Sequence, residues 1–177
     1  MKNILQQLSK NAIELNPDFY GDVEKQQQWI GREPCCNEAI QLIEKRLKVS
    51  LPNDVKEFYS ISNGTSVVLN QTFGAFMPIE QIDWLVNIQK ETLVDYGEMP
   101  ESYLLDLQNA IIISGLNYVH QVFIIQPYGE FKDWKYWEFA SYIPGENVFN
   151  GITSYLERLN DFLIEQIKNR NETKGIN

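Results

Sequence analysis

The sequence has few of the residue types that build metal sites and acid–base active sites. Among 177 residues there are one histidine, His120, and two cysteines, the adjacent pair Cys35 and Cys36. Adjacent cysteines rarely form a disulfide because its geometry would be strained, and no other cysteine is present to complete a zinc site. A catalytic triad needs an imidazole oriented by a carboxylate, and His120 is the only imidazole. We therefore predict no metal, no cofactor and no catalytic residue.

Other signatures are also lacking. Neither a Walker-type phosphate loop nor a G-x-G-x-x-G segment occurs, so phosphate binding has no support from a motif. No apolar run approaches the length of about 18 residues that a membrane helix needs. The first residues, MKNILQQLSKNAIEL, lack the continuous apolar core of a signal peptide, so we expect a cytoplasmic protein that does not contact a membrane.

Basic residues are almost missing from the middle of the chain. Between Glu57 and Phe131 only Lys90 is basic, against nine acidic residues: Glu57, Glu80, Asp83, Glu91, Asp95, Glu98, Glu101, Asp106 and Glu130. This segment has a charge of 1 − 9 = −8, and the whole chain has −9. Such a segment repels phosphate, which argues against direct nucleic-acid binding. It would attract a basic protein, or it is simply an acidic surface without a partner.

Hydrophobic residues make up 44% of the chain, and 22 residues are aromatic, which is enough for one substantial core. We predict a single domain over residues 1–177 with its core at about 30–168. The N-terminal part is expected to form a helix at 2–15, an irregular segment at 17–36 and a helix at 37–48. The polar tail, residues 171–177, is expected to be frayed.

The most informative stretch is LPNDVKEFYSISNG, residues 51–64. Pro52 suits the first turn of a helix, Ser50 or Asn53 could cap it, and Asp54 adds negative charge at the positive helix end. Phe58 is expected in the core, where truncation to alanine should unfold the protein. Asn63 and Gly64 end the helix, because glycine adopts positive φ at little cost.

Together with the N-terminal helices, the remaining sequence predicts helices at both ends of the chain with strands between them. Strands are expected at 66–70, 73–77, 110–114, 119–126 and 134–139, and a turn at Pro144-Gly145. Helices are expected from about 78 to as far as 94, at 101–107, and to about Arg170 after a capping box at Ser154–Glu157. This order predicts an α+β fold, with an antiparallel or mixed sheet and helices packed mainly on one face.

The run IQLIEKRLKVSLPNDVKEFYSISNGTSV, residues 40–67, resembles the signature of the SUKH superfamily, the cell-wall-regulator-like family that includes bacterial immunity proteins. GAFMPIEQI, IIISG, QVFII and ITSYLERLNDFL resemble later pieces of that family in the expected order, so the resemblance spans about residues 30–165. Residues 83–108 are longer and more polar than the family's compact loop. The resemblance implies structural roles for Trp29, Leu51, Pro52, Phe58, Asn63, Gly64 and Pro78.

The resemblance also implies a protein-binding module without catalysis. The first hypothesis is an immunity protein that neutralises a basic toxin domain, possibly a nuclease, and that is a monomer or weak homodimer. The predicted partner-binding residues are Asp83, Trp84, Glu91, Asp95, Tyr96, Glu98, Glu101 and Asp106. Two alternatives stay open: a regulatory scaffold that binds an endogenous partner, or a small-molecule-binding protein whose aromatic strand near Trp134 lines a pocket.

Overall fold

The computed structural model describes residues 1–69, 72–89, 101–140 and 143–174. Its N-terminal part is helical: α1 (Lys2–Leu15), η1 (Pro17–Phe19), α2 (Asp22–Gln27), α3 (Asn37–Leu47) and α4 (Asn53–Ile61). The prediction that residues 17–36 are irregular was wrong for η1 and α2. In α2 the Glu24 carboxylate accepts a hydrogen bond from the Gly21 N–H, so this short helix has the acidic half of a capping box.

The segment between α4 and the sheet is less regular than predicted. No strands form at 66–69 or 73–77; isolated bridges join Leu69 to Phe73 and Phe76 to Ser114. The backbone of this segment does not pair with a single neighbouring strand. Its hydrogen bonds go to several segments, for example from Met77 N–H to Ile113 O. The predicted long helix after Pro78 is replaced by η2 (Ile79–Gln81), β1 (Asp83–Trp84) and α5 (Leu85–Ile88). The part of that prediction at 90–94, like the end of the first strand at Asn70, lies outside the described residues.

The sheet is antiparallel and follows chain order, β1-β2-β3-β4-β5. After α7 (Glu101–Gln108) come β2 (Ala110–Ser114), β3 (His120–Ile125), β4 (Lys135–Ala140) and β5 (Ile143–Phe149). The strands β2, β3 and β4 agree with the prediction to within one or two residues. The prediction of a turn at Pro144-Gly145 was wrong, because these residues lie within β5. A proline is tolerated there since β5 is an edge strand and need not donate on its outer side.

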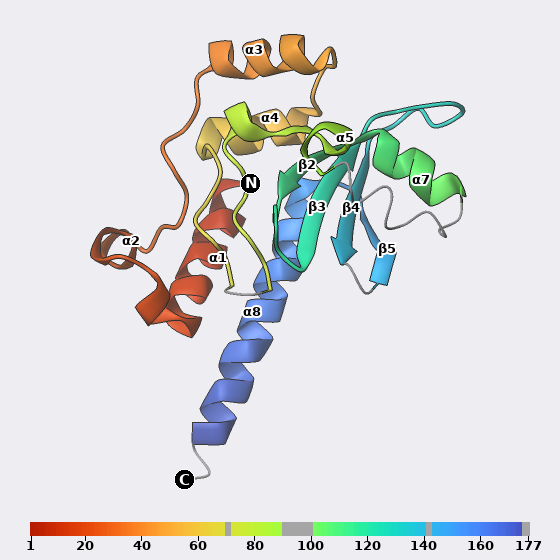
Figure 1. Ribbon diagram of the computed structural model, residues 1–177. Coiled ribbons are helices and arrows are strands. Elements are labelled where there is room, and N and C mark those ends of the chain that lie inside the picture. The colour runs from red at the N-terminus through yellow and green to blue at the C-terminus, as the bar shows by residue number, and fades with distance from the viewer. Residues whose placement is uncertain (70–71, 90–100, 141–142, 175–177) are drawn as a thin grey trace.

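Helices cover both faces of the sheet, most of them on one (Figure 1). Successive residues of β4 alternate between the faces. Tyr136 and Glu138 bond to side chains of α4 and of α8 (Ile152–Lys174). Lys135 and Trp137 contact α7 on the opposite face. This two-sided cover explains why every residue of β2 is buried, since only sheets covered on both faces favour continuous apolar strands.

The long helix α8 runs beside the sheet and packs along α1 (Figure 1). It begins at Ile152, whose N–H donates to Asp54 Oδ2 of α4 at 2.9 Å. The predicted capping box at Ser154 was wrong, because the Ser154 hydroxyl bonds Gly151 O and the helix starts earlier. The helix also continues past its expected end to Lys174. Arg170 donates to the carbonyl oxygens of Glu14 and Leu15, which neutralises the C-terminal end of α1.

Candidate functional site

The residues that carry the family resemblance are structural in this fold. Leu51, Phe58 and Gly64 are buried, and Phe58 has no exposed surface. Gly64 has φ +84°, and a Cβ there would lie 2.5 Å from Phe76 O, so only glycine fits. Asn63 accepts a hydrogen bond from Ile79 N–H at 2.8 Å, which ties the end of α4 to the start of η2.

Two proline positions begin short elements. Pro52 precedes α4 and Pro78 precedes η2. The prediction that Ser50 or Asn53 caps α4 was wrong, because Pro52 is the N-cap residue and the Ser50 hydroxyl donates to Glu44. Trp29 is half-buried and precedes the segment that runs beside the end of α4.

A buried carboxylate, that of Asp106, joins α7 to β4 and to the loop between β3 and β4. Asp106 is 7% exposed and receives hydrogen bonds from Lys135 Nζ at 2.8 Å and from Tyr128 Oη at 2.5 Å. Burial and the Asp106 carboxylate raise the pKa of Tyr128 to about 12. The Lys135 ammonium also lies 3.8 Å from the centre of the Phe131 ring. These contacts fix the loop against α7.

The outer surface of this junction combines acidic and apolar side chains. Glu101 is exposed on α7, and Glu130 and Asp133 are exposed on the loop. Leu105 of α7 is 40% exposed and Phe131 is 52% exposed. We name Glu101, Leu105, Glu130, Phe131 and Asp133 the α7–loop surface; Lys132, which is also exposed on the loop, offsets one of its three negative charges. Exposed apolar side chains among carboxylates are typical of a protein interface with a charged rim.

The residues predicted to bind a partner have different positions. Glu101 is exposed, whereas Asp83 and Trp84 are half-buried in β1. Asp83 accepts hydrogen bonds from Trp84 N–H and from the Asn87 side chain. The expectation that Asp106 stands on the surface is corrected, because its carboxylate is enclosed by Lys135 and Tyr128. Glu91, Asp95, Tyr96 and Glu98 lie outside the described residues.

Sequence reasoning missed the exposure of Leu105 and Phe131. Neither was among the predicted partner-binding residues, which were acidic side chains with Trp84 and Tyr96 as aromatic anchors, because an apolar residue in a helix or near a strand is usually buried. A signal was available in GEFKDW, where Phe131 stands between charged residues after a turn glycine. The pattern of α7 gave no comparable signal for Leu105.

A second buried carboxylate, Glu138, links β4 to α8. Its exposed fraction is 2%, and it contacts His120 Nδ1 at 3.0 Å, Asn147 Nδ2 at 3.0 Å and the Arg158 guanidinium. The cavity beside it holds only about 20 Å³. That volume is too small for a substrate, so this cluster is a packed polar network that fixes α8 on the sheet.

The aromatic strand and Cys35, which the sequence offered as possible ligand-binding or reactive residues, lie in environments that do not favour those roles. Tyr136, Trp137 and Phe139 of the aromatic strand are buried, at 5%, 3% and 3% exposure, so they belong to the core. Burial raises the pKa of the Cys35 thiol, which is the opposite of an activated nucleophile. In the described ranges, no three His, Cys, Asp or Glu side chains are grouped so that they could hold a metal ion. The same part of the chain contains no helix that is long and apolar enough to cross a membrane.

The fold is a single α+β domain. The residues of the Leu51–Gly64 motif that are buried or end a helix serve its structure. The sequence pattern of the SMI1/KNR4 family (SUKH-1) matches residues 34–165. The chain therefore belongs to the SMI1/KNR4 family, within the SUKH superfamily. No match was found among curated proteins. Membership implies protein–protein interaction in general, and it is consistent with an immunity-type or a regulator-like protein.

Proposed function

We propose that this protein is a non-catalytic immunity protein that binds a basic toxin domain, such as a nuclease, in the cytoplasm. The observation that carries the proposal is the combination of family membership with the charge of −8 between residues 57 and 131. An enzyme that acts on nucleic acid must present cationic groups to phosphate. An acidic inhibitor surface competes for those same groups.

The α7–loop surface, four of whose five residues lie between 57 and 131, is the described surface that fits this role best. Its carboxylates would steer the encounter with a basic partner, which raises the association rate at low salt. Phe131 and Leu105 would anchor the complex, because a few apolar or aromatic side chains supply most of the binding energy at interfaces. The mechanism is steric: the bound protein covers the toxin's active site and excludes its substrate.

Charge reversal tests the position of the interface. The triple variant Glu101→Lys, Glu130→Lys, Asp133→Lys should lower the association rate constant with the partner by about tenfold or more at low salt. The matched control reverses three exposed acids of α8, Glu157, Asp161 and Glu165, and has the same net charge. If the two triple variants slow association equally, only overall charge matters and the α7–loop surface is not the interface.

The regulator-like alternative makes a different prediction. A regulatory scaffold binds an endogenous protein, so the neighbouring gene product would be neither toxic nor bound. In that case an affinity pull-down from whole cytoplasm with the wild-type protein should recover one partner reproducibly. The triple variant at Glu101, Glu130 and Asp133 should not recover that partner.

A further inference from the structure

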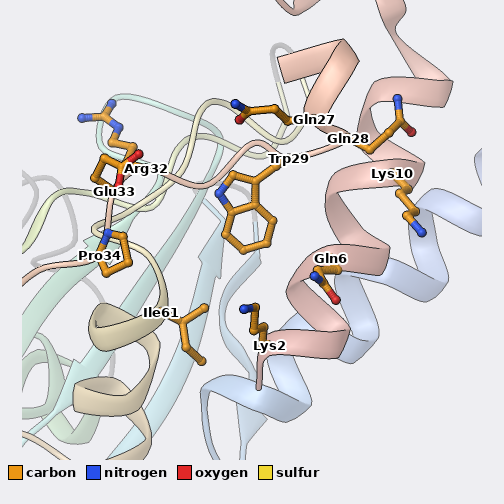
Figure 2. Close-up of a pocket in the computed structure, with 10 residues that line it drawn as sticks. All are labelled: Lys2, Gln6, Lys10, Gln27, Gln28, Trp29, Arg32, Glu33, Pro34 and Ile61. Atoms are coloured by element: carbon orange, nitrogen blue, oxygen red, sulfur yellow. The ribbon is translucent and has the colours of Figure 1, made fainter. Parts of the chain in front are cut away.

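A basic, aromatic pocket is lined by residues of α1, by Gln27 at the end of α2 and by residues of the segment that follows α2. The helices α1 and α2 lie on one side of the sheet and α7 on the other (Figure 1). Figure 2 shows Trp29 at the centre of the pocket, with Lys2, Gln6 and Lys10 of α1 along one wall. Arg32 and Glu33 come from the opposite wall. The pocket has a volume of about 430 Å³ and is open to solvent. Sites of this size hold a small ligand or a few residues of a peptide.

The backbone holds the two walls in place. Residues 30–35 run along the end of α4, with hydrogen bonds from Arg32 N–H to Gly64 O and from Asn63 N–H to Glu33 O. Ile30 N–H donates to the buried Ser9 hydroxyl of α1. The ring of Trp29 lies against Gly31, where a Cβ would approach the indole to 2.5 Å. The indole therefore has a fixed place between the walls.

The charge of the pocket is opposite to that of the protein. Three cations line it against one carboxylate, Glu33, in a chain of net charge −9. Elsewhere Lys56, Lys135 and Arg158 are bound in ion pairs. Within the part of the chain that the structure describes, Lys2, Lys10 and Arg32 form no ion pair. Their charge is available to a ligand.

The spacing of the lysines indicates the shape of that ligand. Lys2 and Lys10 are eight residues apart with Gln6 between them, so a helical rise of 1.5 Å per residue separates them by about 12 Å. In an extended peptide, carboxylates four residues apart are separated by about 13 Å and point to the same side. The residue midway between them also points to that side, where Trp29 would meet an apolar or aromatic side chain.

We infer that this pocket is a second docking surface, which binds a short extended acidic segment of a partner protein. Two carboxylates of the segment pair with Lys2 and Lys10, and an apolar side chain between them stacks on Trp29. A long polyanion fits less well, because the overall charge of −9 repels phosphates beyond the pocket. Eight of the ten lining residues, from Lys2 to Glu33, precede the family match at 34–165. The inference is independent of the immunity proposal.

The test uses two peptides and the full chain. The probe is acetyl-Glu-Ser-Phe-Ser-Glu-amide, and its charge-reversed partner is acetyl-Lys-Ser-Phe-Ser-Lys-amide. Binding is followed by the indole N–H signal of Trp29 in ¹H–¹⁵N spectra, assigned with Trp29→Phe. Inorganic phosphate and a single-stranded oligonucleotide are titrated in parallel. We expect a saturable shift with the acidic peptide, weaker binding at high salt, and no saturable shift with the basic peptide.

Two charge-matched double variants locate the site. Lys2→Glu with Lys10→Glu should weaken binding by about tenfold or more, because like charges then face each other. Lys45→Glu with Lys168→Glu changes two exposed lysines outside the pocket and should retain binding. Equal melting temperatures establish that both variants fold. The inference is overturned if the acidic peptide gives no saturable shift at concentrations up to about 10 mM. A dissociation constant above that concentration would be far weaker than specific recognition requires. Equal binding of the basic peptide, tighter binding of phosphate or oligonucleotide, or equal loss in both variants would also overturn it.

Discussion

Replacement of Asp54 by alanine should destabilise the protein more than replacement of Pro52 or Asn53, the other residues of the LPND motif that are not buried. The Asp54 carboxylate accepts hydrogen bonds from Ile152 N–H at the start of α8 and from the Tyr136 hydroxyl of β4. It therefore joins three elements that are far apart in sequence. Burial and the Asp54 carboxylate raise the pKa of Tyr136 well above that of a free tyrosine.

The magnitude follows from the two lost contacts. Removal of a helix-capping side chain costs about 0.5–2 kcal/mol. A buried hydroxyl left without its acceptor costs about 1–3 kcal/mol. We expect Asp54→Ala to lower the free energy of unfolding by about 2–4 kcal/mol in total, since the two costs overlap. For a domain of this length, the melting temperature should fall by roughly 5–15 °C.

Urea unfolding followed by circular dichroism measures this change. Asp161→Ala, an exposed aspartate of α8, is the control and should change the free energy of unfolding by less than about 0.5 kcal/mol. Tyr136→Phe should cost less in the Asp54→Ala background than alone, with a coupling energy of about 1 kcal/mol. A loss below about 0.5 kcal/mol for Asp54→Ala, or strictly additive effects, would refute the reasoning.

Four further predictions concern stability. Phe58→Ala should cost about 3–5 kcal/mol in unfolding free energy by urea titration, since its ring is fully buried; a near-normal melting temperature would contradict this. Gly64→Ala should lower the free energy of unfolding by about 1–2 kcal/mol or more, because φ is +84° and the added Cβ would contact the backbone of Phe76. A variant as stable as the wild type would show that this position is not strained. Arg158→Ala should cost about 1–3 kcal/mol because the buried Glu138 carboxylate loses its guanidinium partner, and Glu138→Gln in the same chain should recover part of it; no recovery would contradict the pairing. Burial raises the pKa of Tyr59, so the unfolded chain releases the Tyr59 hydroxyl proton near pH 10 while the folded chain keeps it. The free energy of unfolding should therefore fall from pH 10 to 11, and it should fall less steeply in Tyr59→Phe.

Local signals were sufficient to predict much of the fold. The helix at 53–61 has a proline at its start, an apolar face and a glycine after its end, and all three act within a few residues. The strands β2 and β3 are rich in β-branched residues and are buried on both faces. Local reasoning failed for β5, where pairing with β4 overrides the turn preference of Pro144-Gly145.

The candidate site was less predictable because it depends on contacts between distant residues. Asp106 looks like any other carboxylate in the sequence, and it is enclosed by Tyr128 and Lys135, which lie 22 and 29 residues later. The start of α8 depends on Asp54, 98 residues earlier, which replaced the local capping box that Ser154 and Glu157 suggested. Trp29 was assigned a structural role, and the arrangement of α1 against residues 30–35 is what exposes its ring in a pocket.

The most direct test of the central claim is rescue from a toxin. The C-terminal domain of the product of the immediately upstream gene is expressed in cells with and without this protein, and the two chains are co-purified. The immunity proposal predicts that the domain alone kills, that co-expression restores growth, and that a tight one-to-one complex is recovered. A domain that is not toxic and does not bind would contradict the proposal and would favour the regulator-like alternative.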